Sequence, residues 1–225
     1  KTLKFYLEKI NQSRINRIKI YNCNLLLSDF LKFVYNDKIL FQFEKTDIQT
    51  FEIFKIKNCV ISNQDVGILY IFDQLENLSI DGHLPILYNH CSKDYTIINL
   101  VLTNCSVDKG YDEILKIKNL YIKNATGPSV EVKDIQIINC LDENSEIKID
   151  GLNILNDLED LIDFLLKKEI GKISLKNINK KVNISKIKKI FKENQNKYFE
   201  DDLKIINDTV EITSIHYKVN RVLSF

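Results

Sequence analysis

The chain has 225 residues, of which 44% are hydrophobic and 28% charged, and its formal net charge at neutral pH is +1. This length is enough to bury a substantial core, and the composition is ordinary for a soluble protein. No run of about 18 apolar residues occurs, so we expect no membrane-spanning helix. The small net charge excludes neither acidic nor basic partners, because local patches are averaged away.

Residues 1–12 are interpreted as an N-terminal cap or as part of a further repeat, and residues 1–20 lack the apolar stretch of a signal peptide. From residue 13 onward a short phrase recurs. It reads apolar, two variable residues, apolar, one variable, apolar, two variable, and then a small or weakly polar closing residue. Apolar residues two apart point to one face of a short strand, so each copy predicts a strand followed by a bend. The clearest copies cover 15–23, 51–59, 97–105 and 132–140, and weaker ones cover 75–83, 117–125, 147–154 and 170–178.

Four of the five cysteines close repeat copies, and each of the four follows an asparagine. Cysteine is small, tolerates burial and can donate weakly to a loop carbonyl, so we interpret these four as inward-facing structural thiols that stack in a ladder. Asparagine tolerates the left-handed backbone conformation, which suits the exit from a strand. The pairs are Asn22 with Cys23, Asn58 with Cys59, Asn104 with Cys105, and Asn139 with Cys140.

The cysteine usage also bears on the cellular compartment. An odd number of cysteines at repeat-like spacings favours reduced thiols and a cytoplasmic or nuclear location. Six Asn-x-Ser/Thr sequences keep a secreted protein open as the alternative, since they are potential glycosylation sites. They begin at Asn11, Asn77, Asn104, Asn124, Asn183 and Asn207.

Helical patterns lie between and after the repeats. Residues 28–34 predict a short helix capped by Ser28, and residues 156–168 predict the clearest one, with a single apolar stripe and charges that suit the helix dipole. Gly171 ends that helix before a strand at 172–175. A second amphipathic helix is predicted over 185–198, and the tail alternates at Val210 and Ile212 before a last copy or cap.

The recurring phrase resembles the signature of the leucine-rich repeat family, L-x-x-L-x-L-x-x-N/C-x-L, in its cysteine-containing, ribonuclease-inhibitor-like form. The resemblance covers roughly residues 12–180. It implies an α/β solenoid with parallel strands on a concave face and with helices and irregular segments on the convex face. One domain is expected over 1–225, with repeats at 13–180 and a lysine-rich helix and C-terminal cap at 181–225.

Uneven spacing between the closing residues marks departures from that family. The steps from Ala125 to Cys140 and from Cys140 to Leu152 are too short for a helix, so either a tight turn or extended segment covers the convex side there or one copy is not a repeat. The 36-residue step from Cys23 to Cys59 leaves room for a degenerate copy with Phe41, Phe43 and Thr46.

The variable residues of each strand are expected to face outward on the concave side. They include basic, acidic and aromatic residues, and such a mixture of charges can fix how a protein partner aligns with the repeats. The alternative is a merely solvated face. The residues proposed for partner binding are Arg17, Lys19, Tyr21, Lys55, Lys57, Tyr121, Lys123 and Lys148.

Residues 172–197 hold nine lysines and a single acidic residue, Glu193. Such a run can contact phosphates independently of base sequence, which makes RNA a candidate partner. The alternative is the solvated face of an amphipathic helix. The candidate phosphate contacts are Lys180, Lys181, Lys186, Lys188, Lys189 and Lys192.

Catalytic patterns are poor. Gly171 and Lys172 lack the rest of a phosphate-binding loop, and His83, His90 and Cys91 match no zinc spacing. We therefore expect no enzyme, cofactor, metal or small-molecule substrate. The expected function is a protein-binding scaffold within a larger assembly such as a ribonucleoprotein. The resemblance leaves two alternatives, a regulator of a small GTPase of the Ran GTPase-activating kind and a secreted or surface effector.

Overall fold

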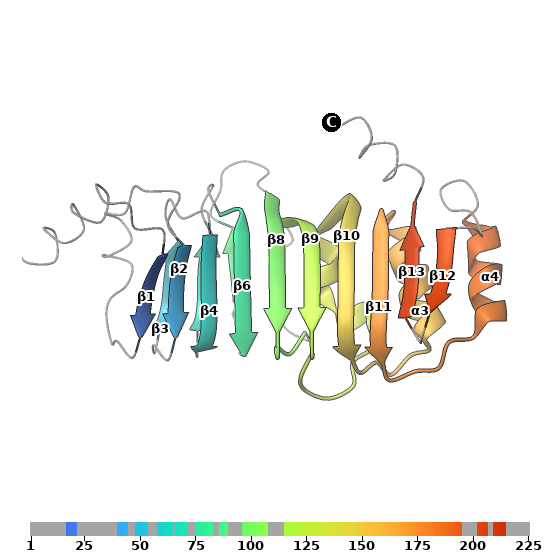
Figure 1. The fold of residues 1–225 in the computed structure, drawn as a ribbon, viewed down its shortest axis with the longest axis horizontal. Coiled ribbons are helices and arrows are strands. Elements are labelled where there is room, and N and C mark those ends of the chain that lie inside the picture. The colour runs from blue at the N-terminus through green and yellow to red at the C-terminus, as the bar shows by residue number, and fades with distance from the viewer. Residues whose placement is uncertain are drawn as a thin grey trace, which may run out of the picture.

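The computed structural model describes residues 17–21, 40–44, 48–53, 58–64, 66–71, 75–82, 86–89, 96–107, 115–194, 202–206 and 209–214. It is an α/β structure dominated by one open, mostly parallel sheet (Figure 1). The order of the strands in this main sheet is β1-β2-β4-β6-β8-β9-β10-β11-β13-β12, and the first eight are parallel. They are β1 (Arg17–Tyr21), β2 (Leu40–Glu44), β4 (Asn58–Gln64), β6 (Asn77–Gly82), β8 (Thr96–Thr103), β9 (Lys116–Lys123), β10 (Leu141–Leu152) and β11 (Lys172–Ile178), followed by the antiparallel β13 (Thr209–Thr213) and β12 (Leu203–Ile206).

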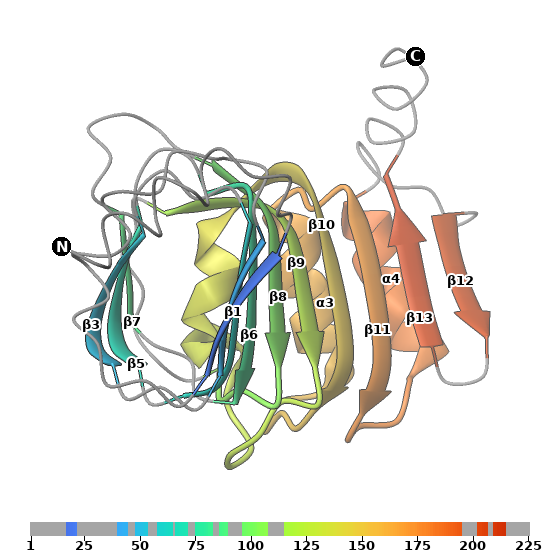
Figure 2. The same ribbon diagram turned by 60° about the vertical axis from the view of Figure 1, so that its left-hand side comes forward.

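A second layer lies against one side of the main sheet (Figure 2). At its N-terminal end this layer is a parallel sheet in the order β3-β5-β7, and towards the C-terminus it is helical. Its members alternate along the chain with the strands of the main sheet, so the chain passes back and forth between the layers. They are β3 (Ile48–Ile53), β5 (Val66–Ile71), β7 (Ile86–Asn89), the 3-10 helices η1 (Val132–Asp134) and η2 (Gln136–Cys140), and the helices α3 (Leu158–Lys167) and α4 (Ile184–Glu193).

The length of each connection accounts for this change from strand to helix. Residues in equivalent positions of successive main strands are 18, 19 and 22 apart where β3, β5 and β7 lie between them. They are 27 and 26 apart where the 3-10 helices and α3 lie between them. An extended residue advances the chain by about 3.3 Å and a helical one by about 1.5 Å. A helix therefore needs more residues to return over the same width of sheet.

The core lies between the two layers and is built from two apolar rows that cross the main sheet. The first row includes Leu78, Leu100 and Leu120, which face one another on neighbouring strands. The second row lies two residues further along each strand. All members from β6 onward are at most 2% exposed: Leu78, Leu100, Leu120, Ile147, Ile173 and Ile212 in the first row, and Ile80, Leu102, Ile122, Ile149, Leu175 and Val210 in the second.

The two α-helices close this core from the second layer. The helix predicted at 156–168 is confirmed as α3, which begins after a capping box made by Asp157 and Asp160. The helix predicted at 185–198 is confirmed in its described part as α4, which buries Ile187 and Phe191. The stripe predicted for α3 is buried as expected and comprises Leu158, Leu161, Ile162, Leu165 and Leu166.

Most of the predicted strands are confirmed, including the weaker copies. Residues 78–80, 100–102, 120–122, 147–149 and 173–175 each form part of a main-sheet strand. The degenerate copy suggested at Phe41 and Phe43 is confirmed as well, since both lie in β2, opposite Ile18 and Ile20 of β1. The tail strand through Val210 and Ile212 is β13. The segments predicted at 1–12 and 28–34 lie outside the described residues.

The copy at 132–140 is wrong as a strand. This segment forms η1 and η2 in the second layer and makes only an isolated bridge nearby, between Val130 and Ile154. Val132, Ile135 and Ile138 are all buried and recur every third residue, which suits a 3-10 helix. The expectation of only a tight turn or extended segment on the convex side there is wrong, because one long connection separates β9 from β10. The alternative, that one copy is not a repeat, applies to 132–140.

The register predicted for Cys59 is also wrong. Cys59 lies inside β4 opposite Leu78, so it occupies the first apolar row rather than the bend. Only Cys105 among the described cysteines follows a main-sheet strand as predicted, and Cys140 ends η2. The expected cysteine ladder is therefore not formed by these three residues, although all three are buried. Cys23 lies outside the described residues. A cysteine can replace an aliphatic residue in a core row because it behaves as a small hydrophobe.

A residue with positive φ lies at the end of each of five main-sheet strands, either within the last two residues of the strand or directly after it. Asn104 has a φ of 53°, and its backbone N–H donates to the carbonyl of Lys123 on the next strand at 2.9 Å. The left-handed role predicted for asparagine is thus confirmed at Asn104 and wrong for Asn58 and Asn139, which lie in a strand and a 3-10 helix. The positions are Gly82, Asn104, Asn124, Gly151 and Asn177.

Candidate interaction surface

The face of the main sheet that points away from the second layer is called here the outer face. Figure 1 looks onto this face, and no helix or strand of the described residues lies over it. Three residues of each strand point to it, one before, one between and one after the two buried rows, because side chains alternate along a strand. The middle residues face one another in register and form a row across six strands: Val60, Ser79, Val101, Tyr121, Lys148 and Ser174.

A ladder of asparagines runs across the outer face beside this middle row. Asn77, Asn99 and Asn119 occupy equivalent positions on β6, β8 and β9. The side-chain amide of Asn99 donates to the side-chain oxygen of Asn77 at 2.5 Å, and that of Asn119 donates to the side-chain oxygen of Asn99 at 2.9 Å. Each bond links two neighbouring strands through side chains, and the ladder holds these polar groups in fixed orientations.

A shallow depression lies over β4, β6 and β8, next to the ladder. Its volume is about 320 Å³, and its side-chain lining is small and uncharged. Val60 and Val101 are half-buried there, so some apolar surface remains accessible on a face that is otherwise polar. The lining comprises Cys59, Val60, Asn77, Leu78, Ser79, Asn99 and Val101.

A charged cluster lies on the outer face over β9, β10 and β11. Glu146 is only 5% exposed, and the same carboxylate oxygen accepts from Lys148 at 3.0 Å and from Lys172 at 3.2 Å. The ammonium group of Lys148 also lies 5.1 Å from the centre of the Tyr121 ring. A buried carboxylate requires such partners, because desolvation of an unpaired charge is costly. Glu146 therefore fixes the position of both lysines.

Three of the predicted partner-binding residues are brought together by this arrangement. Tyr121 and Lys123 belong to β9, and Lys148 lies opposite Tyr121 on β10. All three are on the outer face, as predicted. The side chains of the other five predicted residues are outside the described part of the structure. Arg17, Lys19 and Tyr21 belong to β1, and Lys55 and Lys57 follow β3.

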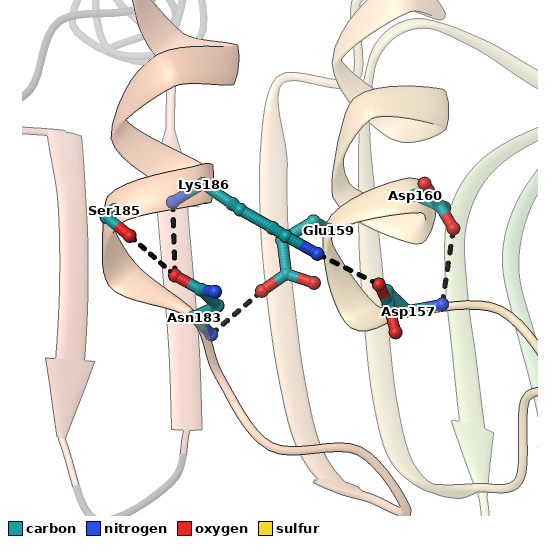
Figure 3. Close-up of polar contacts among 6 residues, drawn as sticks. All are labelled: Asp157, Glu159, Asp160, Asn183, Ser185 and Lys186. Atoms are coloured by element: carbon teal, nitrogen blue, oxygen red, sulfur yellow. Dashed lines mark hydrogen bonds and ion pairs between the residues drawn. The ribbon is translucent and has the colours of Figure 1, made fainter.

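The lysine-rich run does not form one continuous surface. Lys172 and Lys176 lie on β11 and point to the outer face. Lys180 and Lys181 lie in the connection to α4, and Lys186, Lys188, Lys189 and Lys192 lie on α4 in the second layer, whereas Lys197 is outside the described residues. Lys186, one of the candidate phosphate contacts, donates to Asp157 at 3.0 Å (Figure 3). Of the remaining candidates, Lys180 is half-buried and the others are exposed: Lys181, Lys188, Lys189 and Lys192.

The pair between Lys186 and Asp157 belongs to a polar connection between the N-termini of α3 and α4 (Figure 3). Glu159 is 5% exposed and accepts from the backbone N–H of Asn183 at 2.8 Å. Asn183 in turn caps α4 by accepting from the backbone N–H of Lys186 at 3.2 Å. An open cleft of about 580 Å³ lies between these groups. Because its acidic and basic groups bond to one another, we interpret this connection as structural.

The thiols of Cys59 and Cys105 are protonated at neutral pH and are unsuited to nucleophilic chemistry. Burial raises the pKa of the Cys105 thiol to about 11, and burial also raises that of Cys59. The Cys105 thiol donates to the carbonyl of Thr103 at 3.2 Å and to that of Ile80 at 3.6 Å. The sequence predicts donation to a loop carbonyl, whereas both acceptors belong to strands, Thr103 at the end of β8 and Ile80 in β6.

Sequence reasoning missed the asparagine ladder and the central position of Glu146. A signal for the ladder exists, because Asn58, Asn77, Asn99 and Asn119 each directly precede the residue of the first apolar row. This signal becomes visible only in the structural register, in which Cys59 is equivalent to Leu78. The repeat copies read from the sequence instead make Cys59 equivalent to Cys105. Glu146 gives no comparable signal, since nothing in the sequence places Lys172 beside it.

Within the described residues, no three His, Cys, Asp or Glu side chains are grouped in a way that would hold a metal ion. The helices among these residues are also too short or too polar to cross a membrane. Comparisons of the chain with family models, with curated proteins and with solved structures find no match.

Proposed function

We propose that this chain is a leucine-rich-repeat-like solenoid that acts as a non-enzymatic interaction module and holds a protein partner on the outer face of its main sheet. In this proposal the outer face is the concave face and the second layer is the convex one. Two kinds of observation support it: the regular alternation of the chain between the layers, and the composition of the outer face.

The spacing of the strands supports the fold assignment. The strand positions in register with Leu78 are residues 18, 41, 59, 78, 100, 120, 147 and 173, so successive strands are separated by 18 to 27 residues. The leucine-rich repeat period is about 20 to 29 residues. The spacings between strands in the structure are closer to that period than the spacings between the copies read from the sequence. The latter included steps of 12 and 15 residues.

The observation that carries the functional proposal is the outer face itself. It is uncovered by described elements, and it combines half-buried valines, an aromatic ring and charges of both signs in fixed positions. Contacts of these kinds, spread over several strands, give a protein partner both apolar area and charge complementarity.

Photo-crosslinking from defined positions tests this proposal in cell extract. A photoreactive amino acid replaces Val101 on the outer face or, as the matched control, Lys189 on the exposed side of α4. We expect one protein to be captured from position 101 and not from position 189, and its crosslinks to lie close to β6, β8 and β9 in peptide maps. Capture from position 189 alone would assign the interface to the second layer and refute the proposal.

RNA binding by α4 is a second candidate, favoured by one observation. Lys188, Lys189 and Lys192 are exposed, and no acidic partner for them is found among the described residues. This surface would give a ribonucleoprotein a secondary contact with the module. Filter binding of a single-stranded RNA should weaken steeply with salt, because phosphate contacts release counterions. Binding that is insensitive to salt, or unchanged in a Lys188→Glu/Lys192→Glu variant, would exclude this surface.

A cytoplasmic or nuclear location is proposed with this function. Cys59, Cys105 and Cys140 are free thiols in buried positions, which supports a compartment in which cysteines stay reduced.

A further inference from the structure

We propose that the occupant of the outer face is an extended, carboxylate-bearing protein segment that crosses the strands along the middle row. This inference rests on the proposed function, to which it adds the chemistry of the partner. It follows from the order in which apolar groups, in the middle row, and basic groups, in and beside that row, occur across the sheet.

The apolar part of the site is the depression over β4, β6 and β8. Val60 and Val101 flank Ser79 in the middle row, and the asparagine ladder borders them. A small apolar side chain of the partner fits there, because the lining has no charge to desolvate. The side-chain amides of the ladder are fixed by one another, so they offer oriented polar groups to a neighbouring backbone.

The basic part lies over β9, β10 and β11. Four lysines point to the outer face, and three of them, Lys123, Lys148 and Lys176, are exposed. Only two carboxylates of the described residues lie among these four lysines, which leaves two positive charges in excess. Glu146 lies between Lys148 and Lys172, and Asp150 accepts from the side-chain amide of Asn177 at 2.6 Å. The patch therefore has excess positive charge in fixed places, and a carboxylate of the partner complements it.

The dimensions suit one extended segment. The row from β4 to β11 crosses five strand spacings. At about 4.8 Å each this amounts to roughly 24 Å, which about eight extended residues cover. The segment would place its apolar side chains over Val60 and Val101 and its carboxylates near Lys148.

A protein segment is favoured over RNA at this site for two reasons. Glu146 and Asp150 lie among the lysines and would repel a continuous phosphate backbone, whereas a peptide can place its charges selectively. The ammonium group of Lys148 lies over the ring of Tyr121, 5.1 Å from its centre, so a base would compete with it for that face of the ring.

Selection from a random peptide library of about ten residues, displayed on phage, tests the inference with the intact chain as bait. We expect the selected peptides to be enriched in Asp and Glu. Synthetic versions should bind the Lys123→Glu/Lys176→Glu variant about tenfold or more weakly than the parent. The matched control is Lys188→Glu/Lys192→Glu, which makes the same change of charge on α4 and should leave affinity unchanged. The substituted lysines are exposed, and thermal melts verify that both variants fold.

The remaining outcomes separate this inference from the proposed function. Neutral or basic peptides whose binding is lost on Val101→Arg would overturn the acidic partner and leave the outer face as the interface. Acidic peptides whose binding is weakened only by the control substitutions would count against both this inference and the proposed function. A selection that gives no enrichment over an unrelated protein would do the same. An RNA oligonucleotide that binds in a manner sensitive to Lys123→Glu/Lys176→Glu would overturn the assignment to a protein segment.

Discussion

Glu146 shows how much one side chain determines on the outer face. It is nearly buried, yet its partners Lys148 and Lys172 belong to a face that the second layer does not cover. The carboxylate holds the two ammonium groups on neighbouring strands close together. Its loss would leave both lysines without the counter-charge that positions them.

Substitution of Glu146 should therefore lower stability while changing little in shape. We expect Glu146→Gln to reduce the free energy of unfolding by about 1–3 kcal/mol, because two charge-assisted hydrogen bonds become neutral ones in a desolvated place. Urea denaturation followed by circular dichroism measures this loss. Asp142→Asn, a change on the same strand, serves as the comparison, and equal losses in the two variants would show that Glu146 has no special role.

The Cys105 thiol makes a prediction about pH. Its pKa is raised to about 11 in the folded protein by burial, from a value of 9.0 without the fold. Between these values the unfolded chain has released the proton and the folded chain has retained it, so stability falls as pH rises through this window. A Cys105→Ala variant should lose less stability than the parent between pH 9 and 11 in urea titrations. Parallel curves for the two proteins would contradict the assignment.

At the scale of single elements, the exit of each strand is the feature most sensitive to substitution. Gly151 has a φ of 90°, and a Cβ built there lies 3.3 Å from the Cα of Asn124 on the neighbouring strand. Gly151→Ala should cost about 1–3 kcal/mol, since the backbone is strained and the neighbour is main chain rather than a flexible side chain. Asn124→Gly, at a φ of 50°, should stay within about 1 kcal/mol of the parent. Thermal melts of both variants measure these changes in stability. A Gly151→Ala variant as stable as the parent would refute this account of the bend.

The asparagine ladder links elements that are distant in sequence. Asn99 donates to Asn77 and accepts from Asn119, so its removal breaks two bonds and leaves two amides to water. Asn99→Ala should lower stability by about 1–2 kcal/mol. In a double-mutant cycle with Asn77→Ala, the two losses should not add, because they share one hydrogen bond. Additive losses in urea denaturation would mean that the ladder contributes nothing as a unit.

The elements themselves follow from local patterns, which explains what could be read from the sequence. The stripe of α3 and the paired apolar residues of the strands are short-range signals, and both are found where expected. Cys59 and residues 132–140 were misread because a cysteine suits a core row as well as a bend, and because apolar residues every third position also fit a 3-10 helix. Which alternative wins depends on the neighbouring strand, and a single sequence does not contain that information.

Only part of the candidate site could be predicted, because a single sequence does not show which strands are neighbours. Tyr121, Lys123 and Lys148 could be assigned to one face from the alternation of the strands. That Lys172 shares Glu146 with Lys148, and that Lys186 is held by Asp157, depends on which strands and helices are neighbours. The lysine run looked continuous in sequence because β11 and α4 are consecutive, although they lie in different layers.

At the scale of the whole molecule, each strand of the main sheet is hydrogen-bonded within that sheet only to the strands beside it. Interior strands such as β8, β9 and β10 have a partner on both sides, whereas β12 is paired only with β13 among the described strands. Hydrogen exchange measured by mass spectrometry should therefore show the slowest exchange in β8–β10 and faster exchange in β12. Uniform protection along the sheet would instead indicate that all strands open together.

The separation of the two sides of the sheet has a further consequence. The strands are joined by backbone pairing and by their inward residues, so Ser79, Val101 and Ser174 are not required for assembly. These positions are free to diverge during evolution without disturbing the scaffold. An engineer could randomise them and select new recognition properties on an unaltered frame.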